Sequence, residues 1–174
     1  MKQRASTSGL SFIEMMEENV YFVDKSMLIA DLLSMDGRGV YLFTRPRRFG
    51  KTTNLTMLDA FFNLEYKGNT WFDGLEISNH PEFDRYRNAF PVINLNLKNT
   101  KAETFESYVA DLKDALNMTF DKFRYLMKSD LVYDDEKETF NKVIWGTIPA
   151  ENISRCIPLL CRMLERHHGV KPII

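Results

Sequence analysis

Gly50, Lys51 and Thr52 follow one another directly and are the residues of this chain that best fit a chemical task. In a phosphate-binding loop, a glycine lets the backbone approach the phosphates, a lysine reaches the outer phosphates and a hydroxyl holds magnesium. The full pattern, G-x-x-x-x-G-K-[ST], requires a further glycine where this chain has Arg45. These residues alone therefore leave two interpretations open, a phosphate-binding loop or a basic turn that begins a core helix.

The sequence on either side of the loop favours phosphate binding. Val40 to Phe43 is a short apolar run of the kind that forms a strand buried on both faces. From Lys51 the spacing becomes helical, because the following apolar residues fall largely on one side of a helix: Leu55, Leu58, Ala60, Phe61 and Phe62. The sequence thus predicts a strand, a loop and a helix, with the loop glycine at the helix N-terminus, where backbone N–H groups face an anion.

Two longer segments are distinctive in combination. Residues 19–26 read Asn-Val-Tyr-Phe-Val-Asp-Lys-Ser, and residues 45–52 read Arg-Pro-Arg-Arg-Phe-Gly-Lys-Thr. Together they resemble the bacterial and archaeal AAA-ATPase-like family, whose phosphate loop similarly lacks the first glycine. The resemblance also covers residues 11–14, 71–75 and 90–95, so it extends along most of the chain. It implies that Arg45 is a feature of the family.

The resemblance implies a P-loop protein that binds ATP and Mg²⁺. The expected nucleotide-binding residues are those of the Walker A loop: Arg45, Arg47, Arg48, Phe49, Gly50, Lys51, Thr52 and Thr53. Lys51 is expected on the β- and γ-phosphates, and Thr52 is the expected magnesium ligand. The three arginines could instead contact a neighbouring subunit of a homo-oligomer, a nucleic acid or only solvent. No catalytic residue is assigned.

Other functions stay open for the same loop. One is a nucleic-acid-binding module that uses the arginine cluster on phosphates, and such binding weakens steeply with salt. A P-loop kinase is another, although residues 100–170 show no arginine-rich lid. A scaffold that keeps the loop shape without a ligand is the third.

Composition indicates one soluble domain, because the 174 residues are 44% hydrophobic and 27% charged, with a net charge of −1. That charge gives no global attraction to nucleic acid or to a membrane. No apolar run approaches the roughly 18 residues of a membrane span, so we expect no membrane partner and a cytoplasmic location. Cys156 and Cys161 are interpreted as packed thiols.

The remaining elements are predicted from capping and periodicity. Ser11 and Glu14 form a capping box at the start of a first helix, and Thr100 with Glu103 forms a second one before a long helix. Tyr21 and Phe22 are interpreted as core anchors, with stacking on an adenine as the alternative. Adjacent Asp24 and Lys25 are interpreted as a local ion pair. Further helices are expected at 26–33, 136–145 and 152–168.

The predicted fold class is α/β, a P-loop NTPase-like parallel sheet with flanking helices. Residues 1–174 are interpreted as the N-terminal part of one AAA-ATPase-like domain, which ends before the Walker B element. Its expected parts are a helical segment at 1–38, strand, P-loop and helix at 39–63, a second strand at 90–98, a helical region at 100–168 and the start of a third strand at 170–174. The resemblance implies that the full-length protein is an ATPase, often fused to a nuclease domain. Hydrolysis would need residues beyond Ile174, so this fragment is expected to be inactive.

Overall fold

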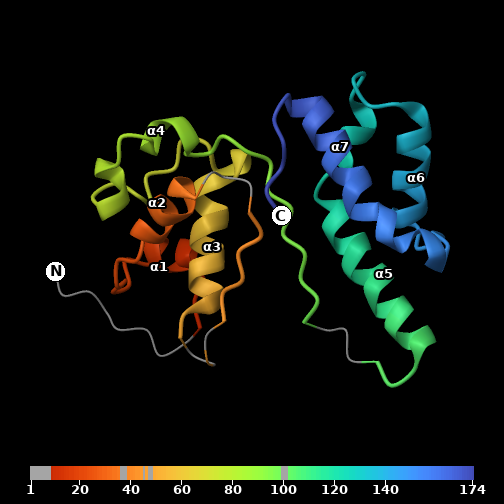
Figure 1. Cartoon of the computed structure of the whole chain (residues 1–174), viewed down its shortest axis with the longest axis horizontal. Coiled ribbons are helices and arrows are strands. Elements are labelled where there is room, and N and C mark those ends of the chain that lie inside the picture. The colour runs from red at the N-terminus through yellow and green to blue at the C-terminus, as the bar shows by residue number, and fades with distance from the viewer. Residues whose placement is uncertain (1–8, 36–38, 45, 47–48, 99–101) are drawn as a thin grey trace. The chain divides into compact units, whose positions relative to one another are not determined.

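The computed structural model describes residues 9–35, 39–44, 46, 49–98 and 102–174. It divides into two units, Met1–Ala89 and Phe90–Ile174, which are both helical (Figure 1). Within the described ranges, no helix has the length and apolar character that a membrane crossing requires.

The first unit begins with helix α1 (Phe12–Glu17), and its predicted capping box is confirmed. The Ser11 hydroxyl accepts a hydrogen bond from the backbone N–H of Glu14, and the Glu14 carboxylate accepts one of 2.7 Å from the backbone N–H of Ser11. The side-chain and backbone hydrogen bonds from Ser11 lower the pKa of Glu14. Two of the orphan N–H donors at the helix start are thereby satisfied.

Helix α3 (Lys51–Phe62) begins at the residue that the sequence predicts. It packs beside α1 through a cluster of fully buried aromatic rings (Figure 1). The ring centroids of Phe12 and Phe72 are 4.9 Å apart, and those of Phe61 and Phe72 are 5.3 Å apart. A hydrogen bond of 2.9 Å from the backbone N–H of Phe12 to Oγ1 of Thr56 adds a polar link between the two helices. The buried residues of α3 all lie in its C-terminal half, so these contacts hold mainly that half, while the first two residues of the helix are exposed.

The C-terminal end of α3 is closed by a buried side chain. The Asn88 amide donates hydrogen bonds to the carbonyl oxygens of Ala60, Phe61 and Asn63 at 2.9–3.2 Å. The last carbonyls of a helix have no partner within it, so a side chain that reaches several of them stabilises the helix end. The first unit is completed by α2 (Met27–Ser34), η1 (Leu64–Tyr66), η2 (Glu76–Asn79) and α4 (Phe83–Tyr86).

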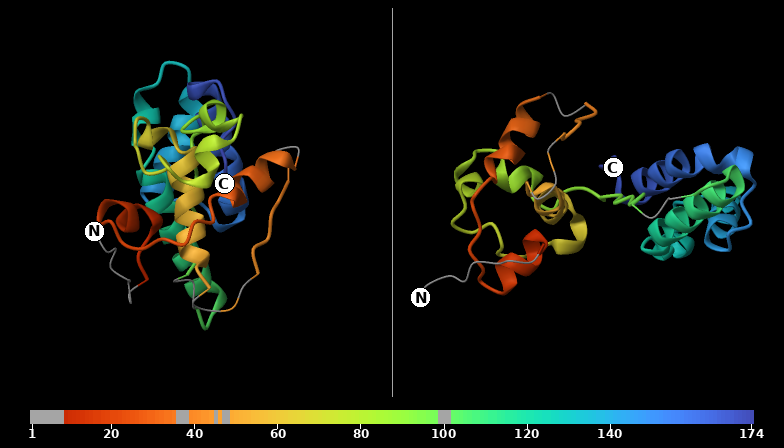
Figure 2. Two further views of the ribbon diagram at one scale, coloured as in Figure 1. Left: turned by 90° about the vertical axis from the view of Figure 1, so that its left-hand side faces the viewer. Right: turned by 90° about the horizontal axis from the view of Figure 1, so that it is seen from below.

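The second unit is built from three longer helices with two 3₁₀ segments. These are α5 (Phe105–Asp121), η3 (Arg124–Lys128), α6 (Asp134–Ile144), η4 (Ala150–Arg155) and α7 (Cys156–His168). α6 contacts both α5 and α7, and the three lie together in each view of Figures 1 and 2. Their shared core is apolar and includes Phe120, Phe140 and Leu160, all fully buried.

The ends of these helices partly match the sequence prediction. α7 stops at Gly169, which has a φ of 72° and suits a glycine. The long helix α5 does not begin at the predicted cap, because Thr104 caps it together with Ser107. Thr100 itself lies outside the described residues.

A buried carboxylate links α6 and α7. Glu136 is 6% exposed and accepts a hydrogen bond from Arg166, while the nearest nitrogen of Arg162 lies 3.6 Å from its other oxygen. The guanidinium of Arg166 also lies over the ring of Tyr133, 3.9 Å from the ring centroid. A charge so far removed from water is tolerated because two cations face it.

The predicted parallel sheet is wrong, since the described residues form no strand. Val40 and Leu42 are 102% and 85% exposed, so the apolar run that we interpreted as a buried strand is neither buried nor paired with another strand. The segments predicted as second and third strands meet only in one parallel bridge, between Val92 and Ile173. A strand requires a continuous ladder of partner hydrogen bonds, and an apolar run alone does not supply that partner.

Candidate phosphate-binding site

The central residues of the predicted loop lie at the N-terminal end of α3. Gly50 is the N-cap residue of α3, with φ 74° and ψ 21° in the left-handed region. Its carbonyl accepts a hydrogen bond of 2.9 Å from the N–H of Asn54, which closes the first helical turn. A residue with a Cβ is strained in this conformation, so the glycine has a local backbone reason to be there.

Lys51 and Thr52 form the first turn of α3, and both are exposed. Among the described residues, no carboxylate lies within ion-pair distance of Lys51. The ammonium group and the Thr52 hydroxyl are therefore accessible at the helix end that carries the positive part of the macrodipole. Backbone N–H groups without intrahelical partners lie at the same end.

The flanking predicted residues are placed differently from one another. Phe49 is 57% exposed, so its ring is not a core residue. Thr53 turns toward the N-terminal segment, because its hydroxyl donates a 3.3 Å hydrogen bond to the carbonyl of Leu10. Arg45, Arg47 and Arg48 lie outside the described residues. The structure thus describes the predicted site residues from Phe49 to Thr53 and does not test the arginine cluster.

Lys25 was not assigned to the site from the sequence, yet it lies at the glycine of the loop. A Cβ built on Gly50 would lie 3.9 Å from Nζ of Lys25, and no other described atom lies within 4 Å once the chain neighbours of Gly50 and the backbone of its own helix are set aside. The sequence offered one indication that Lys25 could lie near the loop, because the family resemblance pairs the segment 19–26 with the segment 45–52. The structure places the Lys25 side chain beside Gly50.

The predicted ion pair between Asp24 and Lys25 is absent among the described residues. The Asp24 carboxylate instead accepts hydrogen bonds of 2.8 Å from the backbone N–H groups of Ser26 and Glu76. Partial burial raises the pKa of Asp24, but the hydrogen bonds from Glu76 and Ser26 outweigh it, and the pKa lies below its ordinary value. The carboxylate therefore anchors the chain beside Lys25.

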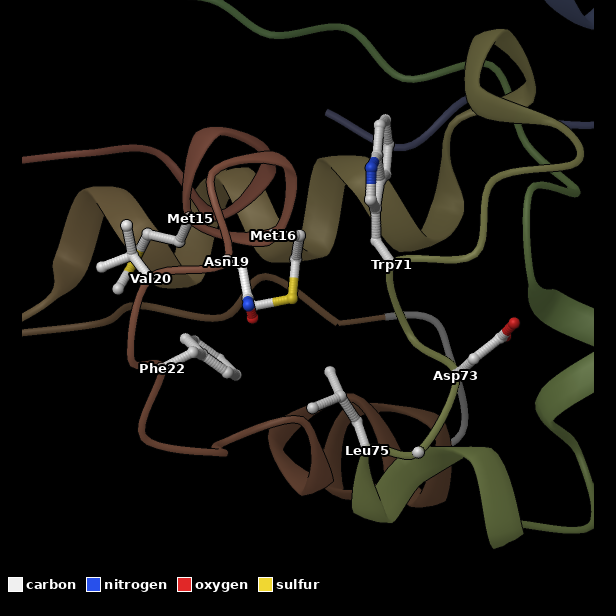
Figure 3. Close-up of a pocket in the computed structure, with 9 residues that line it drawn as sticks. Met15, Met16, Asn19, Val20, Phe22, Trp71, Asp73 and Leu75 are labelled. Carbon is white, nitrogen blue, oxygen red and sulfur yellow. The ribbon is translucent and has the colours of Figure 1, made fainter. Parts of the chain in front are cut away.

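A small hollow lies between α1 and the segment around Trp71 (Figure 3). Met15, Met16, Phe22, Trp71 and Leu75 line much of it, and its volume is about 200 Å³. Pockets for drug-sized molecules usually measure about 300–1,000 Å³, so this hollow lies below the usual size for a ligand of that class. Phe22 packs edge-on against Phe12, with centroids 5.2 Å apart, which agrees with its interpretation as a core anchor. The same interpretation is wrong for Tyr21, which is 57% exposed.

The donor set at the start of α3 fits a magnesium–phosphate group. Mg²⁺ prefers oxygen ligands and usually keeps several waters, with substrate phosphates and one or two protein oxygens completing its shell. The exposed Thr52 hydroxyl is such an oxygen. The structure describes no cluster of three or more His, Cys, Asp or Glu side chains that could hold a metal ion.

Comparison with known proteins gives one positive result. Neither the curated proteins nor the solved structures contain a significant match to this sequence. The model of the AAA-ATPase-like family, described as a predicted AAA-ATPase, matches residues 9–160. Because that match covers most of the chain and reaches into both units, the chain belongs to the predicted AAA-ATPase family.

Proposed function

We propose that the start of α3 binds the phosphates of ATP together with Mg²⁺. The observation that carries the proposal is the left-handed Gly50 directly before a helix whose first two residues, Lys51 and Thr52, are exposed. Membership of a family of predicted ATPases supports an ATP-binding role. The residue roles below are our proposal.

Three groups would hold the nucleotide. The N–H groups from Gly50 to Thr53 form the cradle at the positive end of the helix. The Lys51 ammonium lies on the outer phosphates, where it gives a charge-assisted hydrogen bond. The Thr52 hydroxyl binds the magnesium ion, which neutralises part of the phosphate charge. Because Lys51 is exposed and makes no ion pair among the described residues, it can turn toward a ligand without breaking a contact of the fold.

The test is calorimetric titration of Mg-ATP into the wild-type protein and into Lys51→Ala. Loss of a charge-assisted phosphate contact weakens binding by about ten- to a hundred-fold. Lys67→Ala is the matched control, because Lys67 is an exposed lysine of the same unit, beyond the C-terminal end of α3. Unchanged affinity in Lys51→Ala, with a normal circular dichroism spectrum, would reject the proposal.

The same experiment separates the nucleic-acid alternative. Binding of an oligonucleotide through arginines falls steeply with added salt and depends little on Lys51. ATP binding through the loop requires Lys51 at every salt concentration. An oligonucleotide that binds Lys51→Ala as well as wild type, in a protein that does not bind ATP, would favour the alternative.

A further inference from the structure

The position of Lys25 adds a second lysine to the start of α3. Its Nζ lies 3.9 Å from the point that a Cβ on Gly50 would occupy. Gly50 is the N-cap of a helix of 12 residues, so this nitrogen lies at the positive end of a helix dipole. Within the described part of the chain, Lys25 has no carboxylate partner at ion-pair distance.

The backbone around Lys25 is held by contacts with a distant segment. Asp24 accepts the N–H of Glu76 at 2.8 Å, and the buried hydroxyl of Ser26 accepts the N–H of Ile77 at 3.1 Å. Both neighbours of Lys25 are thus fixed to η2. The backbone of Lys25 is therefore held beside the loop before a ligand binds, so binding does not have to order this part of the chain.

Electrostatics makes this arrangement costly without an anion. Cations are favoured at the C-terminal end of a helix and disfavoured at the N-terminal end. Lys25 and Lys51 both belong to this positive end, and neither is neutralised by a described carboxylate. A phosphate group bound at this end would attract both lysines and the helix dipole, and this attraction would offset the repulsion.

We propose that Lys25 is a second phosphate-binding lysine that contacts the inner phosphates of the nucleotide. This inference rests on the proposed function. In a phosphate loop the backbone amides cradle the α- and β-phosphates, and the loop lysine reaches the β- and γ-phosphates. Nζ of Lys25 lies beside Gly50, whose N–H belongs to this cradle, so we assign Lys25 to the α- and β-phosphates that the cradle holds. It therefore supports ADP and ATP equally.

The experiment compares Lys25→Met, which removes the charge and keeps much of the length, with Lys25→Arg, which keeps the charge. Calorimetry gives the Kd of each protein for Mg-ATP, ADP and adenosine. We expect Lys25→Met to raise the Kd for ATP and for ADP by the same factor, about tenfold. Lys25→Arg should lose less, and adenosine binding should not change in either variant. Lys67→Met serves as the control for removal of a lysine charge elsewhere in the unit.

The outcomes distinguish this inference from the function on which it rests. If Lys51→Ala weakens ATP binding and Lys25→Met binds ATP and ADP like wild type, Lys25 is not a phosphate ligand and the proposed function stands. Equal weakening for adenosine would mean that Lys25 acts through packing, which also overturns the inference. If Lys51→Ala has no effect, the proposed function fails and the inference fails with it. A thermal unfolding midpoint equal to that of wild type verifies that Lys25→Met is folded.

Discussion

The carboxylate of Asp24 accepts a 2.8 Å hydrogen bond from the backbone N–H of Glu76, which lies 52 residues further along the chain. The same carboxylate accepts the N–H of Ser26. The first bond joins the segment before α2 to η2, the second is local, and Lys25 between Asp24 and Ser26 lies next to the start of α3. The site thus depends on a contact that is distant in sequence.

Replacing Asp24 by alanine should destabilise the fold. It removes the acceptor of two backbone N–H groups, and a hydrogen bond to a charged group contributes about 1.5–3 kcal/mol, less where it is exposed to water. We expect a loss of about 1–3 kcal/mol in the free energy of unfolding, measured by urea denaturation. Asp31→Ala is the control, because Asp31 is an exposed carboxylate of α2 and should change stability by less than about 0.5 kcal/mol. Equal effects of the two substitutions would contradict the anchoring role.

The contribution of Asp24 should depend on pH. Burial raises its pKa, but the hydrogen bonds from Glu76 and Ser26 lower it further, so the pKa in the folded protein lies below the ordinary 3.8. A carboxylate with a lowered folded pKa contributes stability that is present above its unfolded pKa and lost as the pH falls through the folded value. The stability difference between wild type and Asp24→Ala should therefore be full at pH 7 and shrink below pH 3.8. Denaturation at several pH values measures it, and a constant difference would show that the charge does not matter.

Gly50→Ala should destabilise α3 through the backbone. A left-handed conformation costs a residue with a Cβ about 1–2 kcal/mol, whereas crowding is not the cause, because the nearest atom to the new Cβ is Nζ of Lys25 at 3.9 Å. Gly50→Asn should cost less, since asparagine tolerates this conformation better. Gly9→Ala, at a position with no atom within 4 Å, is the control. The three variants are compared by thermal unfolding, and a loss in Asn as large as in Ala would contradict the strain argument.

Glu136→Ala should destabilise the second unit more than Glu138→Ala, although only Lys137 separates the two residues in α6. Glu136 is buried and faces Arg166 and Arg162, so its removal leaves both cations without this carboxylate. Loss of one partner of a buried ion pair costs about 3–5 kcal/mol, and partial exposure of the arginines places our expectation near 2–3 kcal/mol. Glu138 pairs with Lys142 on the surface, where water screens the two charges and the contact contributes little to stability. Similar losses in the two variants would contradict the burial argument.

The elements that sequence predicted correctly are those with local causes. The Ser11–Glu14 capping box, the start of α3 at Lys51 and the end of α7 at Gly169 each depend on residues within one or two turns. The cap of α5 was misplaced because Thr104 offers the same hydroxyl chemistry as Thr100, and sequence alone does not rank them.

The predictions that failed or were missed depend on contacts between distant segments. An apolar run such as Val40 to Phe43 fits a strand by composition, but only a paired neighbour makes it one. Likewise, the approach of Lys25 to Gly50 follows from the hydrogen bonds of Asp24 and Ser26 to η2. No local sequence pattern predicts these bonds. The arginines of the loop lie outside the described residues, so their predicted roles stay predictions.

The most direct test of nucleotide binding at α3 is a two-dimensional NMR titration of the ¹⁵N-labelled protein with Mg-ATP. If the phosphates bind at the helix start, the amide signals of Gly50, Lys51 and Thr52 shift with increasing ATP and reach saturation. The same signals in Lys51→Ala shift far less at equal concentrations, while those of α7 stay in place in both proteins. Saturating shifts elsewhere in the chain with unmoved Gly50 to Thr52 amides would contradict the account.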